Sequence, residues 1–283
     1  GISTTVALGR GARFNLPDRY RQAFPDPDTV EVDGTAGTRQ ARVEALVDTI
    51  GKVAPDIVLI ARLADAYEAV CRLKLRSGGK PRLAVTIQAY EPHYIYDAAV
   101  YRQQIDLVVT SGRLIRNALV GWAGLPEERV RSTPGGVRSP VHPMEPRRFL
   151  APLRIGYAGR LDQPQKRVLD LVPFLDELFQ RGIPFTCEVA GAGPAEESLK
   201  ALLHRHLETG RVTLRGWQTA EALYENFYPR LDVFIHFAGA EGVTIAPREA
   251  MAHGVVPVIS EFPGLAAEKH FLNEVNALTF RVG

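Results

Sequence analysis

Two glutamates with the means to bind a polar ligand, Glu241 and Glu249, lie in one short stretch of the sequence with seven residues between them. Pro247 is tolerated only in the first turn of a helix, and Gly254 is a typical C-terminal stop. The pattern therefore predicts a loop that carries Glu241 and a short helix that carries Glu249 about one turn from its start. The free N–H groups and the dipole at a helix start favour an anion between the two carboxylates.

This layout suits a ligand with hydroxyl groups at both ends and phosphate in the middle, as in a nucleotide-sugar. The helix is expected to begin at Thr244 or at Ala246, and a buried strand is expected over residues 255–259. The alternative is a solvated helix start with acidic residues near its positive end. If the stretch binds a nucleotide-sugar, the loop residues expected to contact that ligand are Gly242, Val243, Thr244 and Ile245.

Positive charge is expected on a second loop. The predicted strand over residues 153–158 is followed by Arg160, and Lys166 comes just ahead of a predicted helix. At the carboxyl end of this strand, both side chains would face the ligand. Fixed cations there stabilise the charge that accumulates on a departing diphosphate more than they stabilise the ground state. An ordinary loop arginine and a lysine flanking a helix are the alternative.

The order Glu, seven residues, Glu, then Ala-Met-Ala, a glycine and an apolar strand resembles the signature of retaining glycosyltransferases of family 4, which have the GT-B fold. The resemblance implies that Glu241 contacts the donor sugar and that Glu249 contacts the ribose of the nucleotide. It further implies that Arg160 and Lys166 hold the diphosphate. It covers the second half of the chain, whereas the first half matches mainly in its rhythm of elements.

Other positions gain a meaning from this resemblance. Gly191 and Gly193 fall where the family has a glycine turn. We expect them either to shape the backbone near the nucleotide or to form a simple turn. No third glycine follows at the spacing of a dinucleotide-binding fingerprint. Trp217 falls where the family contacts the base, although we expect it to pack in the core. The family often has a histidine after the strand expected at residues 82–87. This chain has Gln88 there and His93 five residues later, and either is a candidate for the acceptor side.

Strands and helices alternate at intervals of roughly 20–30 residues, which predicts parallel strands joined by crossover helices. We expect an α/β protein with a GT-B-like fold, in which two Rossmann-like parallel-sheet domains face each other across a cleft. Residues 1–138 would form the acceptor-side domain, residues 139–151 a proline-rich linker, and residues 152–283 the nucleotide-sugar-binding domain. We also expect the first strand of the fold and its closing helices to lie outside this sequence. Within the first domain, residues 10–28 are predicted to be a loop, residues 39–53 a helix and residues 55–60 a buried strand. Within the second domain, strands are predicted over residues 185–190 and 233–236, and helices over residues 195–208 and 220–228.

The composition excludes several classes of protein. The chain has 283 residues, of which 46% are hydrophobic and 23% are charged, as in a globular protein. With 34 basic and 32 acidic residues, the formal net charge of +2 argues against nucleic acid as a partner. No run of about 18 apolar residues and no signal peptide is visible. Weak peripheral contact is the only membrane contact expected. The two cysteines lie in apolar contexts, which favours a reducing compartment and hence the cytoplasm.

We therefore expect a retaining hexosyltransferase that moves a hexose-type sugar from a UDP-, GDP- or ADP-sugar to a saccharide, a lipid carrier or a small molecule. No Cys, His or Asp cluster has the spacing of a metal site, and Arg160 and Lys166 could carry the diphosphate charge, so neither a metal nor a cofactor is expected. Two alternatives stay open. One is a nucleotide-sugar epimerase of the same fold, and the other is a catalytically silent nucleotide-sugar-binding protein.

Overall fold

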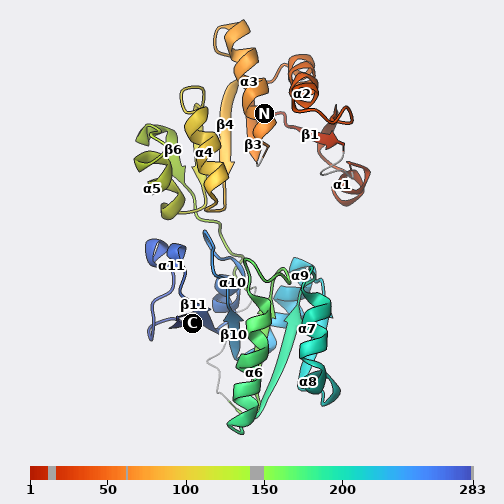
Figure 1. Ribbon diagram of the computed structural model, residues 1–283, viewed down its shortest axis with the longest axis vertical. Coiled ribbons are helices and arrows are strands. Elements are labelled where there is room, and N and C mark those ends of the chain that lie inside the picture. Colours follow the sequence, from red (N-terminus) through yellow and green to blue (C-terminus); the bar gives the residue numbers. More distant parts are fainter. Residues whose placement is uncertain (12–16, 62, 141–149, 282–283) are drawn as a thin grey trace. The chain divides into compact units, whose positions relative to one another are not determined.

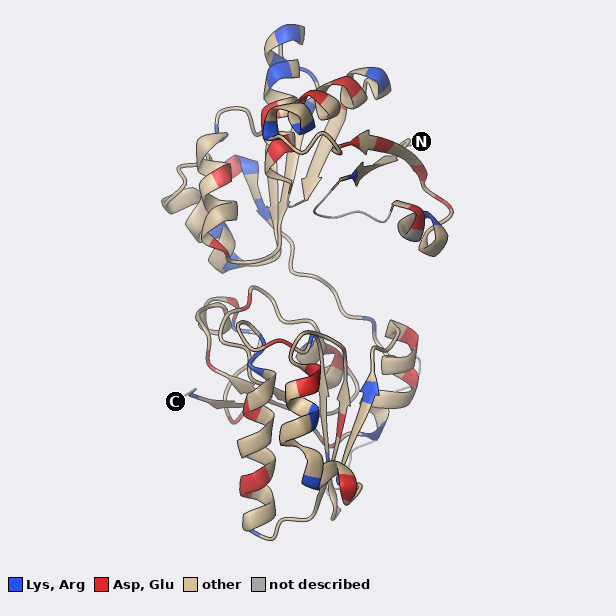
Figure 2. Cartoon of the chain, turned by 45° about the vertical axis from the view of Figure 1, so that its right-hand side comes forward, with Lys and Arg blue, Asp and Glu red and all other residues tan. Residues whose placement is uncertain are grey.

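The computed structural model describes residues 1–283 except 12–16, 62, 141–149 and 282–283 (Figure 1). The chain forms two compact units. Unit 1 comprises Gly1–Ile87, Glu91–Thr110 and Ile115–Ser132, and unit 2 comprises Gln88–Tyr90, Ser111–Leu114 and Thr133–Gly283. Most of the predicted linker 139–151 lies outside the described residues. Figure 2 shows acidic and basic residues interspersed along the chain in both units.

Unit 1 contains a parallel four-stranded sheet in the order β3-β4-β5-β6. Its strands are β3 (Ile57–Ala61), β4 (Arg82–Ile87), β5 (Leu107–Thr110) and β6 (Val130–Ser132). The helices that alternate with them are α2 (Arg39–Val53), α3 (Ala64–Ser77), α4 (Pro92–Val100), α5 (Arg113–Gly121) and the short η1 (Glu127–Arg129). This alternation confirms the predicted parallel α/β architecture for the first half of the chain.

A separate two-stranded parallel sheet, β1 (Thr5–Arg10) and β2 (Asp28–Asp33), opens the chain, with helix α1 (Pro17–Ala23) between the strands in sequence. The prediction of a loop over residues 10–28 was therefore wrong at α1. This helix begins at a proline, which is pre-set for a first turn, and it has Asp18 in its first turn and Arg21 in its last. It is too short for the apolar periodicity on which the prediction relied.

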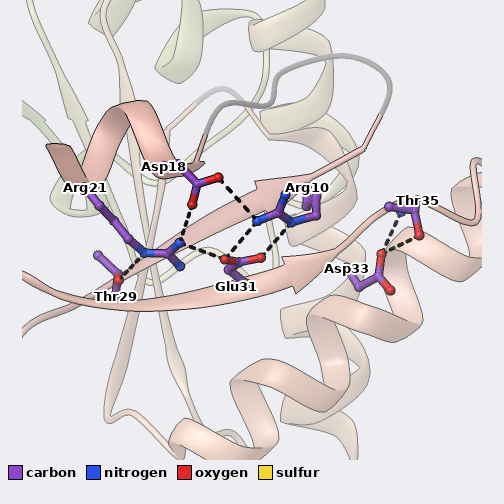
Figure 3. Close-up of polar contacts among 7 residues, drawn as sticks. All are labelled: Arg10, Asp18, Arg21, Thr29, Glu31, Asp33 and Thr35. Carbon is purple, nitrogen blue, oxygen red and sulfur yellow. Dashed lines mark hydrogen bonds and ion pairs between the residues drawn. The ribbon is translucent and has the colours of Figure 1, made fainter. Parts of the chain in front are cut away.

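An ion network joins these three elements (Figure 3). Arg10 donates from Nε to Oε2 of Glu31 at 2.8 Å, and Arg21 donates from Nη1 to Oε1 of the same carboxylate at 2.7 Å. Asp18 lies within ion-pair distance of both arginines. The hydrogen bond from Arg10, and to a smaller extent the one from Arg21, holds the pKa of Glu31 at about 2. The network thus ties α1 to both strands.

Strand β3 forms an edge of its sheet, and the prediction that it is buried was wrong. Ile57 is 62% exposed and Leu59 is 65% exposed, whereas Ile60, which points to the opposite face of the same strand, is buried. No strand pairs with the outer side of β3 in the part of the chain that the structure describes. An unbroken apolar run is typical of a strand covered on both faces, and the sequence pattern alone does not distinguish that strand from a half-covered edge.

Unit 2 contains a parallel six-stranded sheet in the order β12-β11-β10-β7-β8-β9. The chain runs outward from β7 through β8 to β9, and then returns to the other side of β7 with β10. The order of the strands therefore reverses between β7 and β10. In open parallel sheets, ligands bind at the carboxyl ends of the strands at such a switch point. The strands are β7 (Leu153–Ala158), β8 (Phe185–Ala190), β9 (Val212–Gly216), β10 (Val233–His236), β11 (Val256–Ser260) and β12 (Leu278–Phe280).

Helices cover both faces of this sheet. Ile155 and Ile235 pack against Leu171 in one cluster, and Phe234 packs with Ala250 in another. Successive strand residues point to opposite faces, so Ile235 and Phe234 mark the two sides of β10. The helical elements are η2 (Val168–Asp170), α6 (Leu171–Gln180), α7 (Glu196–Leu202), α8 (His204–Glu208), α9 (Ala220–Ala222), η3 (Leu223–Phe227), η4 (Tyr228–Arg230), α10 (Ala246–Ala252) and α11 (Pro263–Glu268).

Two local differences from the prediction and one confirmation concern these helices. The helix expected over residues 195–208 is broken at Leu203, between α7 and α8. The helix expected over residues 220–228 continues from α9 into a π-helical turn, η3, and then η4. Helix α10 begins at Ala246 and ends before Gly254, which decides between the two predicted starts and confirms the predicted stop. No helix within the described ranges is long and apolar enough to cross a membrane.

A half-buried carboxylate, that of Asp106, fastens the sheet of unit 1. Asp106, just before β5, accepts hydrogen bonds from Lys74 Nζ at 2.7 Å, from the backbone N–H of Leu83 at 2.7 Å and from Arg82 Nη1 at 2.9 Å. Burial opposes ionisation of Asp106, but the hydrogen bonds outweigh it and hold the pKa at about 2. Because the pKa is lower in the folded state, the stabilisation is complete above the unfolded pKa of about 4 and is lost as the pH falls through about 2.

We expect Asp106→Asn to lower the free energy of unfolding by about 2 kcal/mol at pH 7, because the two cations lose their charged partner. Urea denaturation at pH 7 and pH 3 measures this loss, which should be smaller at pH 3. Asp56→Asn is the control, since the Asp56 side chain is 95% exposed and only 3.9 Å from Lys80. An equal loss at both pH values would show that the charge of Asp106 does not contribute.

Candidate functional site

The site predicted from the sequence lies at the switch point of unit 2. Lys166 follows β7 and Glu241 follows β10, and these strands are neighbours in the sheet. Their side chains form an ion pair between Lys166 Nζ and Glu241 Oε1. The Lys166 side chain is only 21% exposed and that of Glu241 is 11% exposed, so the pair is shielded from most of the solvent. Two residues 75 positions apart are thus in direct contact.

Arg160 belongs to the same group through Gln165. Arg160 donates from Nη2 to Gln165 Oε1 at 2.5 Å, and Gln165 donates from Nε2 to the carbonyl of Ala240 at 3.2 Å. The loop after β7 is therefore held against the residue that precedes Glu241. The structure brings together three of the four charged residues singled out in the sequence.

Asp162 organises this loop and was missed in the sequence. Its Oδ1 accepts the backbone N–H groups of Gln165 and Lys166, both at 3.0 Å, and its Oδ2 pairs with Arg160. Burial opposes ionisation of Asp162, but these backbone bonds and Arg160 outweigh it and lower the pKa. An aspartate that precedes a tight turn is the kind of residue that accepts such N–H groups, and this signal was present in the sequence.

Gly191 and Gly193, which follow β8, allow the turn after β8 to lie close to the loop after β7. Gly191 has a φ of 151°, and a Cβ atom there would collide with the carbonyl of Gly159. A Cβ atom on Gly193 would lie 2.8 Å from the backbone nitrogen of Leu161 and closer still to its carbonyl. Leu161 in turn donates its N–H to Ala192 O at 3.0 Å. Gly191 and Gly193 therefore serve backbone packing against the loop that carries Arg160.

The loop from Gly242 to Ile245 leads into α10. Thr244 is buried, and its Oγ1 has no hydrogen-bond partner among the residues that the structure describes. The loop rests on the start of α11, where a Cβ atom on Gly264 would lie 2.8 Å from the carbonyl of Gly242 and closer still to that of Glu241. The absence of a side chain at Gly264 thus allows the loop that carries Glu241 to lie where it does.

Glu249 lies on α10 in a second polar group. The hydroxyl of Tyr228 donates to Glu249 Oε2 at 2.7 Å, and the ring of Tyr228 stacks on His253 with centroids 5.3 Å apart. Tyr224 also contacts this group, since its ring packs against both Tyr228 and His253. The tyrosines were not singled out in the sequence, because only the tertiary structure brings η3 and η4 against α10.

A pocket of about 380 Å³ opens at the carboxyl ends of β7, β8 and β9. Trp217 lines it and is 72% exposed, so the prediction that Trp217 packs in the core was wrong. Strand β9 ends at Gly216, whose φ of 66° turns the chain away from the sheet before Trp217. The other lining residues are Gly159, Arg160, Ala190, Gly191, Ala192, Gln218 and Leu223.

The two candidates for the acceptor side lie apart from these groups in the sequence, and the division of the chain places Gln88 in unit 2 and His93 in unit 1. Gln88 is exposed directly after β4, where its carbonyl accepts a hydrogen bond from the hydroxyl of Ser111 at 2.9 Å. His93 is exposed in the first turn of α4, with Nδ1 3.5 Å from Glu91. Their assignment to an acceptor stays a prediction. No group of three or more potential metal ligands occurs within the described residues.

Comparisons with known proteins place this geometry in a wider setting. Residues 152–281 match the family model described as glycosyl transferases group 1. The lipopolysaccharide outer core galactosyltransferase WaaB, in its apo form, superposes with a TM-score of 0.68 over 98% of this chain and 86% of its own, at 16% identity. The chain has the GT-B fold. The predicted fold class, with two Rossmann-like domains built on parallel sheets, is confirmed.

Two further structures with the GT-B fold support this assignment. Alr3699/HepE from Anabaena, in complex with UDP, has a TM-score of 0.71 and 16% identity, and covers 98% of this chain and 78% of its own. A glycosyltransferase from Rickettsia africae has a TM-score of 0.69 and 14% identity, and covers 99% of this chain and 76% of its own. Among curated proteins, none matches this chain in sequence. The coarser part of the resemblance stated above, to group 1 glycosyltransferases, is thus confirmed for residues 152–281.

Proposed function

We propose that this chain is a glycosyltransferase that takes a sugar from a nucleotide-diphosphate donor. The observation that carries the proposal is the shielded Lys166–Glu241 ion pair at the switch point, with Arg160 beside it. A cation that already lies against a carboxylate can bind a diphosphate while the carboxylate accepts a sugar hydroxyl. The family match over residues 152–281 supports the same reading.

In this proposal, Arg160 and Lys166 bind the diphosphate, Glu241 contacts the donor sugar and Glu249 contacts the ribose. As the bond between the anomeric carbon and the phosphate oxygen breaks, negative charge grows on the diphosphate, and the two fixed cations stabilise it. The acceptor hydroxyl forms the new bond from the same face of the sugar. Its proton passes to the departing phosphate oxygen, so the anomeric configuration is retained without a covalent intermediate on the protein.

The finer features of the reaction are part of the same proposal. The transferred group is a hexose, and we infer UDP as the nucleotide to test first because a structure of the same fold contains it. GDP- and ADP-sugars are the other donors to compare. The acceptor is a saccharide, a lipid carrier or a small molecule, with His93 and Gln88 on its side. The reaction takes place in the cytoplasm, and the two cations make a metal ion dispensable for departure of the diphosphate.

A mass-spectrometric screen of the chain against UDP-, GDP- and ADP-hexoses, with a panel of acceptors, tests this function. Transfer to an acceptor, with retained configuration by NMR and unchanged rate in EDTA, is the expected result. Donor binding without turnover would instead identify a silent binding protein. Conversion of the donor without an acceptor would identify an epimerase, and an inverted product would overturn the retaining mechanism.

We expect Trp217→Ala to weaken binding of the free nucleotide by roughly 5- to 150-fold, because base–aromatic stacking contributes about 1–3 kcal/mol. Isothermal titration calorimetry with UDP measures this change. Trp122→Ala is the matched control, since Trp122 in unit 1 is 70% exposed and Trp217 is 72% exposed. Equal affinities of both variants would argue against a base in the pocket beside Trp217.

A further inference from the structure

The Glu249 carboxylate accepts a hydrogen bond from a buried hydroxyl group on the interior side of α10. Tyr228 is fully buried at the start of η4, and its O–H donates to Glu249 Oε2 at 2.7 Å. Glu249 itself is half-buried on α10, one turn after the loop from Gly242 to Ile245. A buried residue thus approaches the carboxylate through the interior, and the exposed part of Glu249 is left for other contacts.

Aromatic rings on several sides fix the position of this hydroxyl. Tyr228 stacks on His253 at an interplanar angle of 30°, and it meets Phe227 and Phe234 at centroid distances of 5.5 Å and 5.9 Å. His253 is fixed in turn, because its Nδ1 lies 2.7 Å from the carbonyl of Glu249. The ring of Tyr228 therefore cannot turn without disturbing the packing of η3, η4 and α10.

The two tyrosines stay protonated and can therefore donate hydrogen bonds. Burial and then the hydrogen bond to Glu249 raise the pKa of Tyr228, so its hydroxyl stays protonated. Burial and the nearby Glu249 charge also raise the pKa of Tyr224. The Tyr224 oxygen accepts the backbone N–H of Arg138 at 3.0 Å, which leaves its own O–H available to Glu249.

Hydrogen-bond stoichiometry then points to the ligand. An ionised carboxylate has about four acceptor positions. The Tyr228 hydroxyl occupies one position and Tyr224 lies close enough to affect a second. The two adjacent hydroxyls of a ribose supply two donors for the positions that remain. Donors that come from a rigid interior also fix the plane of the carboxylate, so the remaining lone pairs point in set directions.

We propose that Tyr228, assisted by Tyr224, is a positioning residue that holds the Glu249 carboxylate in the orientation that accepts both hydroxyls of a ribose. The inference rests on the proposed function and deepens it, because it explains how the site distinguishes a ribonucleotide from one that lacks the diol. Without the Tyr228 hydroxyl, the carboxylate turns freely and binds water in place of the diol.

Calorimetry on the full chain with UDP and with 2′,3′-dideoxy-UDP tests this inference. We expect the unchanged chain to prefer UDP by at least roughly tenfold, because a partly buried acceptor that loses its donor is unfavourable. Tyr228→Phe keeps the ring and removes the hydroxyl. It should bind UDP roughly tenfold more weakly and dideoxy-UDP with unchanged affinity, so that most of the preference is lost. A preference that stays the same in Tyr228→Phe, whether both ligands weaken equally or neither weakens, would overturn the inference.

A control and a second variant make this test independent of folding. Tyr67→Phe alters a tyrosine of unit 1 that is also buried and ring-stacked, and the preference for UDP should be unaffected there. Tyr224→Phe should lose part of the preference, and it carries the comparison if Tyr228→Phe does not fold. If the unchanged chain bound no UDP, GDP or ADP at all, the proposed function would fall. If it bound them without preferring the diol, only the role of the tyrosines would fall.

Discussion

Replacing Lys166 by methionine should lower kcat by roughly 100- to 1000-fold, because the departing diphosphate loses a fixed positive charge in a partly dry site. The substitution keeps an unbranched apolar side chain of nearly the same length and removes the ammonium group. It also leaves Glu241 without its partner, so we expect a modest loss of stability of about 1–3 kcal/mol. KM should change less than kcat, since the charge on the diphosphate is largest in the transition state.

Steady-state kinetics with the best donor from the screen measure the effect of Lys166→Met. Lys200→Met is the control, because Lys200 is also a paired lysine of unit 2 but lies on α7, where its partners are Glu196 and Glu197. The control should retain its activity. Equal kcat values for the two variants would show that Lys166 does not stabilise the leaving group, and a change in KM alone would restrict Lys166 to donor binding.

Adding one methyl group at Gly264 should have the second largest effect. The new Cβ atom would overlap the carbonyls of Glu241 and Gly242, which are backbone atoms and cannot turn away as a flexible side chain can. We therefore expect Gly264→Ala to destabilise the protein by about 1–3 kcal/mol. Because the loop must shift, Glu241 would move away from Lys166, and a displacement of about 1 Å can lower the rate roughly 100-fold.

Gly51→Ala provides the contrast for this experiment. Gly51 lies inside α2, and a Cβ atom there meets no atom within 4 Å. That substitution should stabilise the protein by about 0.5–1 kcal/mol, because alanine loses less backbone entropy in a helix than glycine. Thermal unfolding and donor turnover of both variants are the measurements. A Gly264→Ala variant with normal kcat would mean that the loop adapts without displacing Glu241.

Much of the fold could be predicted because its signals are local. Residues 39–53, 153–158, 185–190 and 233–236 have the predicted element types and bounds, since each is a continuous periodic or apolar segment between clear breaks. Helix α1 and the edge position of β3 could not be predicted in this way. A two-turn helix has too few residues to display a period, and the burial of a strand depends on which strand lies beside it.

Some residues of the candidate site could likewise be predicted from the sequence, and others could not. Arg160, Lys166 and Glu241 could be singled out because each follows a predictable strand, and adjacent parallel strands bring their carboxyl ends together. Trp217 was misjudged because its exposure depends on the turn at Gly216. The contact of Tyr228 with Glu249 arises only when η4 packs on α10, and no spacing in the sequence encodes it. Residues that act through other residues are therefore the hardest to find from sequence.

The open side of β3 affects how the protein behaves at high concentration. Its N–H and C=O groups have no partner strand on that side in the described part of the chain, and Ile57 and Leu59 stand exposed on the same strand. Such a border is a template onto which a strand from another molecule can add, in the manner that begins aggregation. A lysine in place of Leu59 would put a repelling charge on this border, which is how natural sheets discourage such growth.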